Sequence, residues 1–175
     1  MTVGGLTFAD LLADAFGRVH DALVTVVEGL SADQLAYQPG PGSNTIAWLA
    51  WHLTRVQDDH IAGAAGTEQV WTSQGWQERF ALPLPTLDTG YGHSADQVLA
   101  VRASSDLLSA YHEAVFGRTV EFVRSLRQAD LDRIVDKRWD PPVSLGVRLV
   151  SIIDDDLEHV GQAAYVRGLT ERRLP

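Results

Sequence analysis

The chain has 175 residues, of which 45% are hydrophobic and 21% charged, a composition typical of a soluble globular protein with one substantial core. Its net charge of −9 disfavours nucleic acid and anionic membranes as partners, because both require a basic surface. The absence of cysteine excludes disulfides, cysteine-ligated zinc and a catalytic thiol of the protein's own, so any thiol chemistry needs a small molecule that brings the sulfur.

Residues 1–16 contain no basic leader ahead of an apolar run, which predicts that there is no export signal. No apolar stretch approaches the roughly 18 residues that a membrane-spanning helix needs. We therefore expect a cytoplasmic protein with no membrane partner. Its length predicts a single domain over residues 1–175.

Apolar residues at helical spacing predict a first helix over residues 7–30. Ser31 and Gln34 then form a capping-box pattern that opens a short helical turn. The Pro-Gly-Pro-Gly run at 39–42 ends this turn and reverses the chain.

Asn44 is a suitable N-cap for a second helix over residues 45–62. A polar and aromatic row lies beside the apolar stripe of this helix, and it consists of Trp48, His52, Arg55 and Asp59. Residues 63–93 follow without clear periodicity. A segment of this length predicts either a crossover laid over the other helices or a functional loop.

A second capping box at 94–97 opens the longest predicted helix, residues 94–128. After a connection over residues 129–142, Ser144 caps a final helix that is expected to end at Gly168. Four amphipathic helices, two short links and one long crossover between the second and third predict an all-α fold, an antiparallel four-helix bundle. No segment shows the alternating pattern of a strand. Helix faces of bundles often pair, so a homodimer is a further expectation.

The final helix carries three successive carboxylates, 154–156, and a histidine within an otherwise apolar sequence. Asp155 and His159 are four residues apart, so both side chains lie on one face, one turn apart, where they offer two metal ligands. Asp154 is expected to face water. The predicted core stripe of this helix is Val150, Ile153, Leu157, Val160 and Ala164.

A third ligand is expected from a facing helix, and His52 is the best candidate because it lies mid-helix at the margin of an apolar stripe. Two imidazoles and one carboxylate leave coordination positions for water or substrate, which is typical of a catalytic site. The alternative is that the acidic run is a solvated strip and His159 is a hydrogen-bonded partner of one of its carboxylates.

The segment Asn44-Thr-Ile-Ala-Trp-Leu-Ala-Trp-His-Leu53, together with His159-Val-Gly-Gln162, resembles the DinB-like superfamily of metal-binding four-helix proteins. The resemblance implies an up-down-down-up bundle, one metal-ligating histidine on the second helix, and two ligands a turn apart on the last. Most members have a histidine where this chain has Asp155. With an acidic residue at this position, the ligand pattern resembles that of the branch that contains mycothiol-dependent maleylpyruvate isomerase and thiol S-transferases.

This resemblance implies a divalent metal, most commonly zinc, with Ni²⁺ or Fe²⁺ as alternatives, and a mycothiol-like, low-molecular-weight thiol as cosubstrate. A metal ion lowers the pKa of a bound thiol, and the thiolate can then attack a small electrophile. The isomerase carries an additional C-terminal domain, whereas this sequence ends after its fourth predicted helix. We therefore expect a transferase rather than an isomerase.

Other residues near the expected site have competing interpretations. Asp59 is a candidate catalytic base, and Trp48, Arg55 and His93 are candidate substrate contacts. In the structural alternative, Arg55 and Asp59 form a surface ion pair and the tryptophans cover the core. His60 and His112 are interpreted as core histidines.

Three other functions use the same pattern. A metal-dependent hydrolase would use a metal-bound water, with Asp59 or Asp156 as base. A non-haem iron enzyme would use the two histidines and the carboxylate as ligands. A non-enzymatic helical module, which could be a dimer, would use the polar cluster for structure only.

Overall fold

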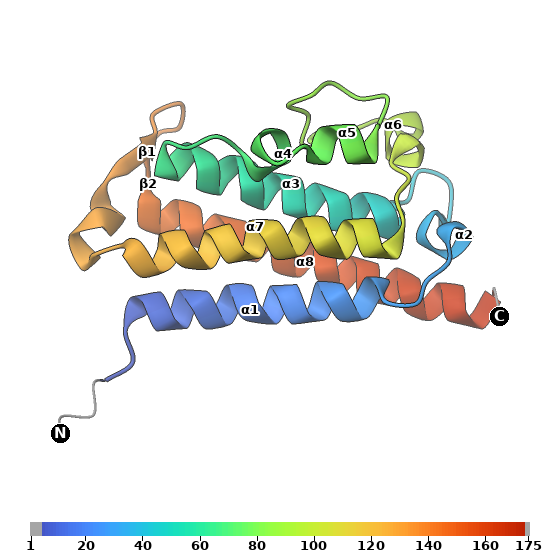
Figure 1. The fold of residues 1–175 in the computed structure, drawn as a ribbon, viewed down its shortest axis with the longest axis horizontal. Helices are drawn as coiled ribbons and strands as arrows, with labels where there is room; N and C mark the ends of the chain where they lie inside the picture. The colour runs from blue at the N-terminus through green and yellow to red at the C-terminus, as the bar shows by residue number, and fades with distance from the viewer. Residues whose placement is uncertain (1–4, 174–175) are drawn as a thin grey trace.

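Four long helices run side by side in the computed structural model, which describes residues 5–173 (Figure 1). They are α1 (Phe8–Val27), α3 (Ile46–Ala65), α7 (Ser105–Ser125) and α8 (Leu145–Arg173). Helices α1 and α8 run in one direction and α3 and α7 in the other, which is the up-down-down-up order implied by the family resemblance. Each of α1 and α3 packs against both α7 and α8. The all-α expectation is confirmed.

The outermost residues, 1–4 and 174–175, lie outside the described part of the chain. Part of the segment on which the export-signal expectation depends is therefore not described. The same holds for the two ends of the predicted single domain. Within the described part, no helix combines the length and apolar character that crossing a membrane would require.

Side-chain caps set where several helices begin. The short helix α2 (Ala32–Leu35) begins at the predicted capping box of Ser31. The N-cap of α3 is Thr45, whose hydroxyl accepts the backbone N–H of Trp48 at 3.1 Å, so the prediction of Asn44 was one residue early. Thr45 has the extended backbone that an N-cap requires.

The predicted third helix is interrupted and forms two helices, α6 (Ala95–Ala100) and α7. Val101 has an extended backbone and buries its side chain in the core. Ser104 then accepts the backbone N–H of Leu107 and starts α7. Burial of a valine and a new N-cap therefore outweigh the helical periodicity of this segment.

The final helix continues past Gly168 to Arg173, so the predicted stop was wrong. Its last turns remain packed, because Val166 and Thr170 are buried. The guanidinium of Arg167 also binds the end of α1, donating to the carbonyls of Thr25, Val26 and Glu28. These tertiary contacts stabilise the helix across a residue of low helix propensity.

The buried face of α8 differs from the predicted stripe. Val150 and Leu157 are 62% and 49% exposed, whereas Val160 is buried as expected. The buried positions of α8 are Leu145, Leu149, Ile152, Asp156, Val160, Ala163, Val166 and Thr170. Because a carboxylate occupies one core position, a search for apolar periodicity selects a face rotated toward solvent.

The apolar core consists of two clusters separated by polar residues. One cluster includes Val160 and the other Ile152, and Asp156 lies between them on α8. Gln57 on α3 and Thr119 on α7 are also buried between the clusters, and the Gln57 amide donates to the Thr119 hydroxyl at 2.7 Å. A polar layer therefore crosses the middle of the bundle.

The long crossover covers one side of the bundle, as one of the two predictions for it stated (Figure 1). It contains two short helices, α4 (Val70–Ser73) and α5 (Trp76–Phe80). The rings of Trp71, Trp76 and Phe80 pack around Tyr111 of α7. Aromatic burial, which has no simple periodicity in sequence, therefore holds this segment in place.

Between α7 and α8, a 3₁₀ helix (Gln128–Asp132) precedes a small antiparallel hairpin of β1 (Ile134–Asp136) and β2 (Val143–Ser144). The expectation of no strand was wrong for this connection. The pairing is too short to produce an alternating pattern. The hairpin places residues 137–142 at one end of the bundle (Figure 1).

Candidate metal centre

The structure brings the three predicted ligands together. His52 extends from α3, and Asp155 and His159 extend from the adjacent α8. One ligand atom from each residue lies within 4.8 Å of the other two. Ligand atoms around a tetrahedral zinc ion, at bond lengths of 2.0–2.2 Å, lie about 3.4 Å apart. Small side-chain rotations would therefore close this group around one cation.

Hydrogen bonds orient both imidazoles for coordination. The Nδ1–H of His52 donates to the carbonyl of Thr89, and the Nδ1–H of His159 donates to the carbonyl of Asp155 at 2.9 Å. In each ring Nε2 is left with its lone pair for a metal ion. Burial lowers the pKa of His52, outweighing the opposing effect of the Thr89 hydrogen bond, and favours the neutral form that ligates metals.

Asp155 supplies the oxygen ligand. Its Oδ2 atom is buried and has no hydrogen-bond partner among the residues that the structure describes. An unsatisfied buried carboxylate oxygen is costly unless a cation or donor reaches it. Two imidazole nitrogens and this oxygen form a donor set that fits zinc and other divalent transition metals.

Gly90, in the crossover, packs directly against His52. Its backbone has a φ of +94°, a region that side chains other than glycine rarely adopt. A Cβ atom at this position would lie 2.7 Å from Nδ1 of His52. The crossover can therefore approach the ligand and present the Thr89 carbonyl only because residue 90 is glycine.

Trp48 and His93 help to hold His52 in position. The indole N–H of Trp48 donates to Nδ1 of His93 at 3.0 Å, and Nε2–H of His93 donates to Asp88 at 2.9 Å. Trp48 also stacks on His52 with ring centroids 4.4 Å apart. Both side chains are buried and neither lines the cavity next to the ligands. The structure thus gives these two predicted substrate contacts a positioning role.

Asp88 connects this support to the crossover backbone. One carboxylate oxygen accepts the backbone N–H of Gly90 at 2.8 Å, and the other accepts His93. Partial burial raises the pKa of Asp88, but the hydrogen bonds from Gly90 and His93 outweigh it, so the pKa lies below its ordinary value. Asp88 therefore remains a carboxylate that fixes the turn over His52.

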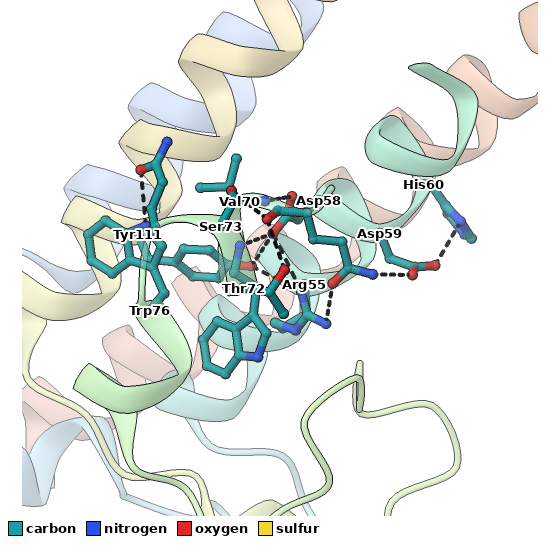
Figure 2. A network of polar contacts seen from close by, with 12 residues as sticks. Arg55, Asp58, Asp59, His60, Val70, Thr72, Ser73, Trp76 and Tyr111 are labelled. Atoms are coloured by element: carbon teal, nitrogen blue, oxygen red, sulfur yellow. Dashed lines mark hydrogen bonds and ion pairs between the residues drawn. The ribbon is translucent and has the colours of Figure 1, made fainter. Parts of the chain in front are cut away.

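Arg55 does not reach the ligands or solvent. Its side chain is fully buried and donates to the Asp88 carbonyl at 3.1 Å, Gln69 Oε1 at 2.8 Å and the Tyr111 hydroxyl at 3.2 Å. Its carboxylate neighbour is Asp58 (Figure 2), 3.5 Å away, and not Asp59. The expectation of a substrate contact or surface ion pair is therefore corrected to a buried tie between α3 and the crossover.

Asp58 anchors the start of α4. Its two oxygens accept the backbone N–H groups of Val70 and Trp71, each at 2.8 Å, and the Tyr111 hydroxyl donates to it at 2.9 Å (Figure 2). Burial raises the pKa of Asp58 despite these hydrogen bonds. The crossover is thus held at two places, by Arg55 and Asp58, next to the ligand-bearing part of α3.

A cavity of about 700 Å³ lies next to the ligands. His52 and Asp155 form part of its wall, and Asp59 also lines it. Tyr91 and Trp139, which are 93% and 65% exposed, also line it. A volume of this size accommodates small-molecule substrates.

Comparisons with known proteins identify the family. The family model of the DinB superfamily matches residues 15–163. The chain belongs to the DinB superfamily. A crystal structure described as a conserved protein from Enterococcus faecalis is similar to it, with 31% identity and a TM-score of 0.89, over 97% of this chain and 100% of that one. The comparison with curated proteins found no match.

This DinB-superfamily protein has cavity residues that the sequence interpretation missed. Arg148 lies seven residues before Asp155, two helical turns away, and this spacing could have indicated a shared face. Asp136 and Arg138 belong to the hairpin connection, which offers no such signal. His60 was interpreted as a core histidine, but it is 31% exposed and lines the same cavity.

Asp156 has a different environment from its neighbour Asp155. It is fully buried, and neither carboxylate oxygen has a hydrogen-bond partner in the described part of the chain. Burial, reinforced by the nearby charge of Asp155, raises the pKa of Asp156 well above its ordinary value. It is not among the residues that line the cavity, so the structure does not support Asp156 as a hydrolytic base.

Proposed function

We propose that this protein is a metal-dependent transferase that attaches a low-molecular-weight, mycothiol-like thiol to a small electrophile. His52, Asp155 and His159 would hold one divalent cation, with zinc as the first candidate. The observation that carries the proposal is a set of three ligands, rather than the four of a closed structural site, next to a cavity of about 700 Å³. The cavity provides space for the cosubstrate and the electrophile.

The reaction forms a carbon–sulfur bond. A divalent cation in the site would lower the pKa of the thiol, so that a thiolate is present at neutral pH. As the sulfur attacks, the bond from the electrophilic carbon to its leaving group breaks, and the thiol proton ends on the leaving group or in solvent. The absence of cysteine is consistent with an external thiol.

Asp59 is the candidate proton acceptor. Its carboxylate lines the cavity and is 42% exposed. The Gln69 amide donates to its Oδ1 at 2.7 Å, which fixes the side chain, and its Oδ2 lies 3.5 Å from Nδ1 of His60. In this role Asp59 would accept the thiol proton and transfer it to the leaving group.

Metal analysis and thiol consumption test the proposal. Protein purified without an affinity tag should contain a divalent metal and should consume thiol in the presence of members of an electrophile panel. Asp59→Asn should retain the metal and lose most turnover. Metal-loaded protein without thiol-dependent turnover would overturn the transferase. Ester or amide hydrolysis without added thiol would then favour a hydrolase, and aerobic substrate oxidation with iron would favour a non-haem iron enzyme.

A further inference from the structure

The cavity has a second end, away from the metal ligands, which is rich in positive charge. A neighbouring hollow of about 360 Å³ shares part of its lining with the cavity, so the two lie next to each other. The shared residues are Asp59, His60, Asp136, Arg138 and Arg148. Lys137 adds a third cationic side chain to the hollow.

Two arginines flank one buried carboxylate here. Arg138 binds Asp136 with two nitrogens, at 3.0 and 2.9 Å, and Arg148 binds it at 2.9 Å. These contacts, those of Arg138 foremost, hold the pKa of Asp136 well below its ordinary range. One carboxylate neutralises only one of the two guanidinium groups, so the group keeps a net positive charge.

Both guanidinium groups retain donor capacity. Arg148 uses one N–H on Asp136 and another on Nε2 of His60 at 3.1 Å, and its remaining N–H groups have no partner among the described residues. Its side chain is only 14% exposed, so its position is fixed. Arg138 is 84% exposed, and the edge of its guanidinium that carries Nε and Nη2 binds Asp136. Unused, oriented donors of this type suit a planar carboxylate.

The charge of this end contrasts with that of the whole protein. Three cationic side chains face two carboxylates, Asp59 and Asp136, which leaves one excess positive charge in a chain of net charge −9. This excess matches a monoanion better than a doubly charged phosphate. Arg148 and Asp155 are two turns apart on α8, or about 10 Å along its axis. A short organic acid, with the reach of the side chains, spans this distance.

We propose that Arg138 and Arg148 form a carboxylate-binding site, so that the substrate is a small organic acid whose reacting atom lies toward the metal ligands. The assignment of the electrophilic substrate as an organic acid rests on the proposed function. The anion site itself can be measured without thiol and without turnover. Trp139, on the wall of the same cavity, provides a local signal.

Binding of butanoate, with its neutral analogue butanamide as ligand control, tests the site. Zinc-loaded protein is titrated while the indole N–H resonance of Trp139 is followed by NMR, assigned by its loss in Trp139→Phe. Butanoate should shift this resonance and butanamide should not. Arg138→Gln removes a charged donor, and Arg148→Lys keeps the charge but removes the forked guanidinium donors. Each should weaken binding about tenfold. Arg118→Gln removes an exposed arginine of α7 outside the cavity and should leave the affinity unchanged.

Three results would overturn the proposal. Equal binding of butanamide would show that charge is not recognised. Butanoate binding that persists in both arginine variants but disappears when zinc is removed would make the metal the carboxylate site. Tighter binding of inorganic phosphate than of butanoate would contradict the choice of a carboxylate. Arg138→Gln alters an exposed side chain, so its result stands even if Arg148→Lys fails to fold.

Discussion

Replacing Gly90 with alanine should weaken metal binding although no predicted ligand is substituted. The new Cβ would lie 2.7 Å from Nδ1 of His52, 3.1 Å from Trp51 and 3.2 Å from Trp48. Real Cβ contacts essentially never fall below 3.0 Å, so His52 or the turn must shift, which disturbs the hydrogen bond between His52 and the Thr89 carbonyl. The positive φ adds about 1–3 kcal/mol of backbone strain. Loss of an outer hydrogen bond to a histidine ligand typically weakens metal affinity about 10- to 100-fold.

Gly92→Ala is the matched control. Gly92 also has a positive φ, +73°, but apart from its chain neighbours no described residue has an atom within 4 Å of the position that a Cβ would take there. Both variants therefore carry backbone strain, and only Gly90→Ala displaces the ligand. Zinc affinity is measured by competition with a chromophoric chelator, and stability by urea denaturation. Equal zinc affinity in the two variants would refute the reasoning that the Thr89–Gly90 turn positions His52.

Two further predictions concern the buried polar groups. Burial lowers the pKa of His112 to about 3. Between pH 6.5 and 3, this histidine is therefore mostly protonated in the unfolded chain and mostly neutral in the folded one. From this residue the free energy of unfolding should therefore fall by about 1.2 kcal/mol as the pH falls from 6 to 5, and urea denaturation should show a shallower fall in His112→Leu; an unchanged slope would contradict this. Asp58→Ala should cost about 3–5 kcal/mol in the same assay, because it leaves Arg55 buried without a carboxylate. Asp59→Ala, one residue further on and half-exposed, should cost under about 1 kcal/mol, and similar losses in both variants would exclude the buried tie.

The ligand triad could be predicted because helical geometry is local. Asp155 and His159 share a face by their spacing alone, whatever surrounds them. The choice of His52 as third ligand depended on its mid-helix position and on the family resemblance. The same local reasoning failed for the buried face of α8, because Asp156 is a core residue with a polar side chain.

The surroundings of the triad depend on contacts that have no sequence signal. Arg55 and Asp58 help to hold the crossover whose Thr89 carbonyl binds His52, and the sequence predicted neither residue to be a buried tie. Arg138 reaches the cavity through a hairpin too short to recognise. Tertiary placement, rather than propensity, therefore decides which side chains face the cavity.

The central claim is that His52, Asp155 and His159 hold one cation, and the metal-to-protein ratio tests it most directly. Tag-free protein equilibrated with zinc and then dialysed should retain about one ion per chain. His52→Ala should retain almost none while its circular dichroism stays helical. An unchanged ratio in folded His52→Ala, or wild-type protein that retains no metal, would contradict the account.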